Sequence, residues 1–205
     1  RMTTSRIVQG AAALLLGLGF AAPAVAQAPQ ERPKSQVPTL GRPTKPDDPA
    51  PLLDFWAYFK GAWNVTWDYP DSPLGPADVM SGTTVYTQTS ATTFEATTTA
   101  EHSGGAFTTS ERFEYDREAH ALTRTVTDSR GFTYVQKGTV NGDLGGQFTI
   151  RLDGTPFTHQ GKSVRVNSVM RLLSPLNYRT QYTLSVDGGP FANYGNPWWR
   201  KESSK

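Results

Sequence analysis

From Gly61 to Lys201 the chain is a series of short runs, rich in Thr and aromatic residues, in which inward and outward positions alternate. Trp63, Val65, Trp67 and Tyr69 show this period of two, which is typical of a β-strand with one buried face. Gly, Asn and Asp separate the runs, and such short turns join antiparallel neighbours. No helix long enough for a parallel crossover interrupts the series. The sequence therefore predicts an all-β antiparallel meander.

The pattern predicts about ten strands and one short helix. The strands are expected near residues 61–69, 78–89, 92–101, 106–115, 121–128, 132–140, 147–153, 163–173, 178–186 and 191–201. Apolar residues spaced three and four apart between Leu52 and Phe59 predict a short helix that ends at Gly61. A meander of this length usually removes its exposed edges by closing, so we expect an up-and-down barrel, with a two-sheet sandwich as the rival architecture.

The N-terminal part of the sequence has the features of an export signal. Arg1 and Arg6 precede an apolar run from Ala11 to Phe20, and small residues follow at 24–26. This run is too short to span a bilayer and predicts a signal peptide over residues 1–26, cleaved after Ala26. Seven prolines predict a disordered linker over 27–51, before a barrel domain over 52–201 and a tail over 202–205. We expect a periplasmic or secreted protein.

Charge and composition limit the partners. The 20 basic residues exceed the 18 acidic ones only by Arg1 and Arg6, so the chain beyond the signal is formally neutral. No cluster of Lys or Arg follows in the sequence, which argues against nucleic acid. Polar residues on both strand faces, as in Thr97 to Glu101, argue against stable membrane insertion. With no Cys, stability must come from a buried core, and the oligomeric state stays open.

Several short motifs resemble the lipocalin-like (calycin) barrels, and in particular a bacterial domain of this type without a settled activity. They are Tyr58-Phe59-Lys60-Gly61-Ala62-Trp63, Tyr115-Asp116, Thr127-Asp128-Ser129-Arg130-Gly131, Gly138-Thr139-Val140 and Trp199-Arg200-Lys201. The resemblance covers about residues 52–201. It implies structural roles for Gly61 and for Trp63, which would close the base of the barrel. It also implies that Arg200 stacks over the Trp63 ring as a cation–π partner.

No catalytic or cofactor-binding constellation stands out. His102, His120 and His159 lack metal-ligand spacing, and the last three strands offer no axial His for haem. No Ser lies in a nucleophile elbow, and no glycine loop precedes a helix that would bind phosphate. Scattered acids, namely Glu95, Glu101, Glu111 and Glu114, are expected to face solvent. We therefore predict no catalytic residues, no metal and no cofactor.

The barrel interior is the remaining candidate site, since a barrel of this size can hold one small ligand. The candidate ligand-binding residues are Trp67, Tyr86, Phe94, Arg112, Arg124, Tyr134 and Tyr182. Arg124 shares a strand face with Leu122 and Val126, and an inward Arg124 would need an anionic partner. The alternative places Arg124 in water and a Thr-lined face inside.

The leading hypothesis is a non-enzymatic exported barrel that binds a small hydrophobic or amphipathic ligand. One alternative is a barrel-cavity enzyme of lyase or isomerase type, which an inward Glu or Arg beside a Tyr would favour. The other is a filled barrel that acts as a structural or interaction module, which a very small pocket would favour.

Overall fold

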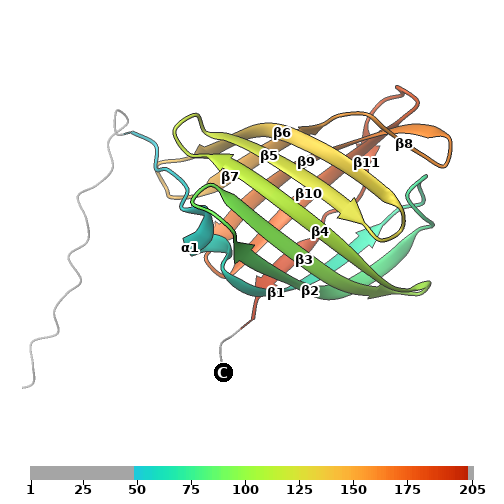
Figure 1. The fold of residues 1–205 in the computed structure, drawn as a ribbon, viewed down its shortest axis with the longest axis horizontal. Helices are drawn as coiled ribbons and strands as arrows, with labels where there is room; N and C mark the ends of the chain where they lie inside the picture. Colours follow the sequence, from blue (N-terminus) through green and yellow to red (C-terminus); the bar gives the residue numbers. More distant parts are fainter. Residues whose placement is uncertain (1–48, 203–205) are drawn as a thin grey trace, which may run out of the picture. The chain divides into compact units, whose positions relative to one another are not determined.

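The computed structural model describes residues 49–202. The predicted signal peptide and most of the predicted linker lie outside these residues, as does most of the predicted tail. The elements are α1 (Phe55–Phe59), β1 (Gly61–Tyr69), β2 (Asp78–Gln88), β3 (Thr93–His102), β4 (Gly105–Asp116), β5 (Ala121–Asp128), β6 (Phe132–Gly142), β7 (Phe148–Gly154), β8 (Phe157–His159), β9 (Lys162–Ser174), β10 (Asn177–Val186), β11 (Ala192–Asn193) and β12 (Trp198–Lys201). Figure 1 shows the strands wrapped into a barrel with α1 at one end and β8 at the other.

The barrel is closed by hydrogen bonds between the first and the last strand. Each strand from β1 to β6 pairs antiparallel with the next one along the chain, and then β7 pairs with β9, β9 with β10 and β10 with β12. The seam joins β12 to β1, where Val65 lies opposite Trp199 and Trp63 opposite Lys201. Closure confirms the predicted antiparallel barrel of ten strands. The rival sandwich is wrong, because this ring has no open edge.

Two positions in the ring are each filled by a pair of short strands. Both β7 and β8 pair with β9, and both β11 and β12 pair with β10. Pro156 lies between β7 and β8, and Pro197 lies before β12. Since proline lacks an N–H group, each interrupts the ladder. The single strand predicted for 191–201 is therefore two strands in the structure, and β8 was not predicted.

The helix α1 plugs one end of the barrel with aromatic side chains. Asp54 caps the helix by accepting a hydrogen bond from the Ala57 N–H at 2.9 Å. Phe55 and Phe59 are buried, and the Phe55 ring stacks on Phe94 with centroids 4.4 Å apart. Burial of each such ring contributes about 1.5–3 kcal/mol. This end of the barrel is consequently packed solid.

Trp63 lies at the base of the barrel, as the resemblance implies. Its side chain is fully buried, and its Nε1–H donates to the Phe59 carbonyl at 2.7 Å. Gly61, just before it, has φ of +105°, a conformation that glycine adopts readily and that lets the chain turn from α1 into β1. The cation over the Trp63 ring is Lys201, with its Nζ 4.9 Å from the centroid. The prediction of Arg200 is wrong, because Arg200 lies opposite Asn64 and is exposed.

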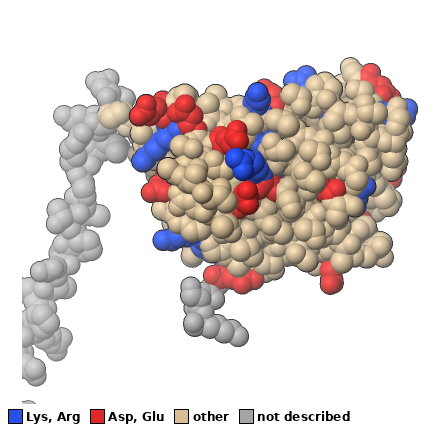
Figure 2. All heavy atoms as spheres, viewed as in Figure 1, with Lys and Arg blue, Asp and Glu red and all other residues tan. Residues whose placement is uncertain are grey.

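The outer wall is polar where β3 to β6 form it. In Figure 2 acidic and basic side chains lie beside one another on this face, between wide uncharged areas. Arg112 on β4 is half exposed here and contacts Glu95 at 3.6 Å and Glu114 at 3.2 Å. Within residues 49–202 there is no helix with the length and apolar character to cross a membrane.

Candidate ligand site

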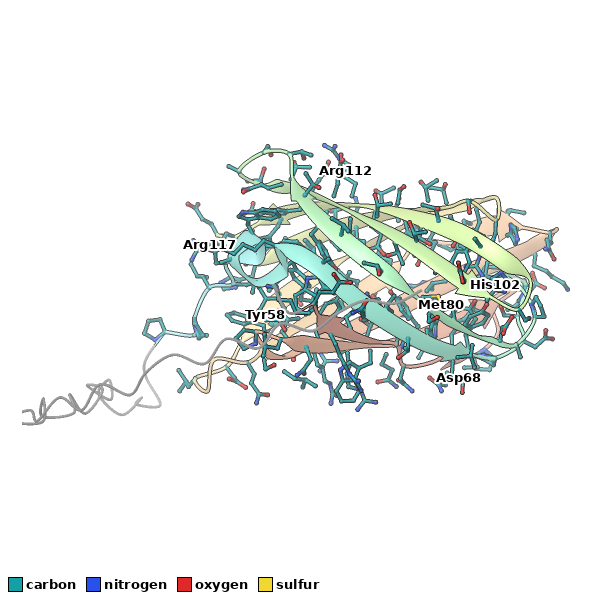
Figure 3. All side chains as sticks on the ribbon, turned by 90° about the horizontal axis from the view of Figure 1, so that it is seen from below. Tyr58, Asp68, Met80, His102, Arg112 and Arg117 are labelled. Carbon is teal, nitrogen blue, oxygen red and sulfur yellow. The ribbon has the colours of Figure 1, made fainter. Side chains whose placement is uncertain are left out.

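The half of the barrel farther from α1 encloses a cavity of about 50 Å³. Figure 3 marks the two ends of the barrel, with Tyr58 of α1 at one end and His102 at the opposite end, toward which Met80 lies. Most of the wall is apolar or aromatic. It is formed by Trp67, Leu74, Met80, Thr98, Phe107, Thr109, Glu111, Arg124, Val126, Asp128, Arg130, Phe132, Tyr134, Val166, Tyr182, Tyr194 and Trp199.

A buried ion pair forms part of this wall. Arg124 on β5 is 3% exposed, and its Nε–H donates to Glu111 Oε2 at 2.9 Å, while Nη2 lies 2.8 Å from Oε1. Burial alone would lower the pKa of Arg124, but the Glu111 carboxylate raises it well above its ordinary value. The two-point contact neutralises the guanidinium within the barrel. Arg124 therefore points inward, and the alternative that placed it in water is wrong.

The remaining contacts of Arg124 fix the polar atoms around it. Its Nη1–H donates to Gln136 Oε1 at 3.1 Å, and Gln136 in turn donates from Nε2 to the Val166 carbonyl at 2.8 Å. Its Nη2–H also donates to the Tyr182 hydroxyl at 2.9 Å. Among the described residues, the bond from Arg124 is the only hydrogen bond of the Tyr182 hydroxyl. Tyr182 can thus offer a donor to a molecule in the cavity.

The tyrosines of the cavity are neutral phenols. Burial raises the pKa of both Tyr134 and Tyr182, and the nearby Arg124 cation lowers it only in part. No hydrogen-bond partner for the Tyr134 hydroxyl is found in residues 49–202, and this residue borders the cavity. At neutral pH both groups are therefore hydrogen-bond donors rather than bases.

A second ion pair closes the outer end of the cavity. Arg130 donates from Nε and Nη2 to the two carboxylate oxygens of Asp128, at 2.9 and 2.8 Å. The guanidinium carbon of Arg130 lies 4.2 Å from the centroid of the Phe107 ring. Thr109 also donates to Asp128, at 3.1 Å. The outer end of the cavity, like its interior, therefore carries charges that are paired.

A hydroxyl network supports the wall on the β1 side. Trp199 is buried and donates from Nε1 to Thr84 Oγ1 at 3.1 Å. Thr84 and Thr98 share a hydrogen bond of 2.7 Å, and Thr98 borders the cavity. Trp198, the neighbour of Trp199, lies on the outer side. Of the two adjacent tryptophans only one points inward, as alternation along a strand predicts.

The structure brings together four of the seven predicted ligand-binding residues. Trp67, Arg124, Tyr134 and Tyr182 line the cavity. Tyr86 and Phe94 are buried in the aromatic packing near α1, where Tyr86 shares a hydrogen bond of 2.8 Å with Tyr178. Arg112 is on the outer side of the barrel (Figure 3), so its predicted role as an interior anchor is wrong.

The polar partners in the cavity were not predicted. Glu111 was expected to face solvent with the other scattered acids, but it is inward and pairs with Arg124. A signal was present, because Glu111 lies two residues before Phe113 and four before Tyr115, on the buried face of β4. Asp128 and Arg130 were noted only as part of a turn motif.

The histidines do not assemble a metal centre. His102 Nδ1 lies 3.1 Å from Asp78 Oδ2, and the His159 ring packs edge-on against Phe132 at 5.2 Å. His120 is in a turn, with Nδ1 3.3 Å from the Val140 carbonyl. In the part of the chain that the structure describes, no group of three or more His, Cys, Asp or Glu is placed to hold a metal ion.

These features define a small closed antiparallel β-barrel with a neutral cavity whose wall is mostly apolar or aromatic. The crystal structure of Rv2717c from M. tuberculosis is similar with a TM-score of 0.62 and 13% identity, over 76% of this chain and 100% of that one. A de novo designed fluorescence-activating β-barrel gives a TM-score of 0.44 at 14% identity, over 74% of this chain and 100% of the design. No protein-family model and no curated protein matches the sequence. The likeness to Rv2717c is one of fold alone.

Proposed function

We propose that this protein is an exported, non-enzymatic barrel that binds one small, neutral, amphipathic molecule in its cavity. The observation that carries the proposal is the Tyr182 hydroxyl, which accepts from Arg124 and keeps its own proton without an acceptor in the described residues. A ligand oxygen that accepts this proton would add a hydrogen bond, which contributes about 0.5–1.5 kcal/mol to binding.

The ion pairs argue for a neutral ligand. Glu111 neutralises Arg124 and Asp128 neutralises Arg130, so no unpaired charge faces the cavity in the described residues. A charged ligand would lose hydration and gain no counter-ion there. A neutral carbonyl or hydroxyl compound instead meets the donors of Tyr182 and Tyr134 and the aromatic wall.

The cavity also limits the size of the ligand. Its volume of about 50 Å³ is well under the roughly 300–1,000 Å³ of typical small-molecule sites. The ligand is therefore only a few heavy atoms in size, or flexible wall residues such as Met80 move to admit a larger one. A cavity this small also favours the filled-barrel alternative, so the mass of a retained ligand distinguishes the two.

Native mass spectrometry of the protein purified from the exported fraction of its own host tests the proposal. We expect a retained mass above that of the bare chain, and an affinity about tenfold lower for Tyr182→Phe, the effect of one lost hydrogen bond. Tyr178→Phe is the matched control, since Tyr178 is a buried Tyr outside the cavity. A bare mass, with no ligand found in a screen of small amphipathic molecules, contradicts the proposal and favours a filled barrel that acts as an interaction module.

A second candidate is a barrel-cavity enzyme of lyase or isomerase type. Tyr182 and Glu111 both contact the buried Arg124, which favours this candidate. A proton donor, a carboxylate and a cation then line the same cavity. Both carboxylate oxygens of Glu111 are held by Arg124, however, so the site offers a proton donor without a free base. Conversion of the retained molecule by the wild type, lost in Tyr182→Phe, would favour this candidate over the carrier.

A further inference from the structure

Four arginines that are far apart in sequence come together on the outer wall of β7, β9, β10 and β12. Arg171 on β9 lies directly opposite Arg179 on β10. Arg151 on β7 is opposite Val169, two residues before Arg171. Arg200 on β12 is opposite Asn177, two residues before Arg179. All four are exposed, so they form a diagonal row across four strands, named here the arginine wall.

No ion pair with a described residue neutralises the arginine wall. None of its four members forms a salt bridge with a carboxylate of residues 49–202. Like charges directly opposite each other on a sheet are destabilising, so the Arg171–Arg179 pair costs stability in the isolated protein. On the opposite wall, by contrast, Arg112 lies between Glu95 and Glu114. The uncompensated row fits an anionic partner.

Apolar groups are interleaved with these cations. The Trp198 ring lies between two guanidinium groups, 4.9 Å from Arg179 and 5.5 Å from Arg200. Leu176, in the turn from β9 to β10, is 65% exposed, and Leu173, near the end of β9, is 40% exposed.

The Leu176 carbonyl accepts a hydrogen bond from the Lys201 N–H at 2.8 Å, which holds the end of β12 against this turn. Arg200, the residue before Lys201, is therefore carried beside the exposed leucine. Charge and apolar surface thus belong to one patch.

We propose that the arginine wall, with Trp198, Leu173 and Leu176, is a docking surface for an anionic lipid membrane. Guanidinium groups bind phosphate headgroups through paired hydrogen bonds, and Trp prefers the interface between headgroups and acyl chains. Exposed leucines beside cations are the composition of surfaces that lie in such an interface. A soluble polyanion would account for the arginines but would leave Leu176 in water.

Flotation with lipid vesicles tests this surface. The purified protein is mixed at low salt with vesicles of phosphatidylglycerol and phosphatidylcholine in equal parts, and with vesicles of phosphatidylcholine alone. We expect binding to the first only, weakened by added salt. Arg171→Gln/Arg179→Gln should weaken binding about 30-fold, given the attraction of each cation to an anionic surface. Leu176→Ser should weaken it as well.

The matched control is Arg112→Gln/Arg117→Gln, which removes the same charge from exposed positions on or beside β4. Its binding should stay close to that of the wild type, and thermal unfolding confirms that each variant is folded. Equal weakening by both pairs would show a net-charge effect and overturn the proposal. Absence of vesicle binding would overturn it too, as would tighter binding to a DNA duplex than to the anionic vesicles.

Discussion

Glu111 and Arg124 form a two-point ion pair inside the barrel, with their oxygen and nitrogen atoms 2.8 and 2.9 Å apart. The residues belong to neighbouring strands, and Arg124 lies opposite Phe113, two positions from Glu111. The pair makes the cavity polar without making it charged. Each partner is stable in this place only because the other is present.

Removal of one partner of this pair should strongly destabilise the fold. We expect Glu111→Met to lower the free energy of unfolding by about 3–5 kcal/mol, because it leaves a buried cation without a counter-ion. The double variant Glu111→Met/Arg124→Met should lose much less of its free energy of unfolding. Urea denaturation measures both, with Glu114→Met in the exposed pair as the control, at about 1 kcal/mol or less. A loss for Glu111→Met no larger than for the control would contradict this account.

Substitution of Lys201 should affect stability much more than substitution of Arg200, although the two residues are adjacent. The Lys201 ammonium lies over Trp63 and donates to the Tyr58 carbonyl at 3.0 Å. Lys201→Met should therefore lower stability by about 1–2 kcal/mol, the sum of a cation–π contact and a hydrogen bond. Arg200→Met should have a small effect on thermal unfolding. A larger loss of stability for Arg200→Met than for Lys201→Met would indicate that Arg200, and not Lys201, lies over the Trp63 indole.

Asp78 should make stability depend on pH in the acid range. Hydrogen bonds from Ser103, from the Val79 N–H and from His102 lower the pKa of its carboxyl from 3.8 to about 2. A carboxyl with a lowered folded-state pKa stabilises the fold above its unfolded pKa, and this contribution is lost as the pH falls through the folded value. The wild type should thus exceed Asp78→Asn in stability at pH 7. The two unfolding curves should converge between about pH 4 and pH 2, and a constant gap would refute the assignment.

Gly138 marks a place where β6 and β7 approach closely. A Cβ atom at this position would collide with the Arg151 carbonyl and approach Leu152 Cα to 3.1 Å. Gly138→Ala should therefore lower the free energy of unfolding by about 1–3 kcal/mol, as overpacking does. Lys137→Ala, at the exposed neighbouring position, is the control in the same urea titration. If Gly138→Ala were as stable as the control variant, β6 and β7 would have moved apart at no cost in free energy, which would contradict this account.

The strands were predictable because each one carries its own signal. Alternation along β1 identifies its inner face without knowledge of any other strand. The same rule placed Arg124 with Leu122 and Val126, and those apolar neighbours decide its direction. The sequence alone left Arg124 in water and a Thr-lined interior as the alternative, and the counter-ion that decides against it lies on another strand. Strand pairing, which a single segment does not reveal, supplies Glu111.

Pairing between distant strands also explains the other missed features. A shift of one residue exchanges the two faces of a strand, and the register of β12 against β1 selects Lys201 rather than Arg200. The arginine wall arises in the same way, from the registers of four strands. A short stretch of sequence contains no signal for either feature.

The seam between β1 and β12 has a consequence for the order of events in folding. Residues 198–201 are the last to join the ring, and they pair with the strand that comes first. A chain that includes β10 but still lacks residues 198–201 presents two unpaired edges, at β1 and β10. Such edges invite association with other chains. The barrel is thus most vulnerable to aggregation just before its last four paired residues arrive.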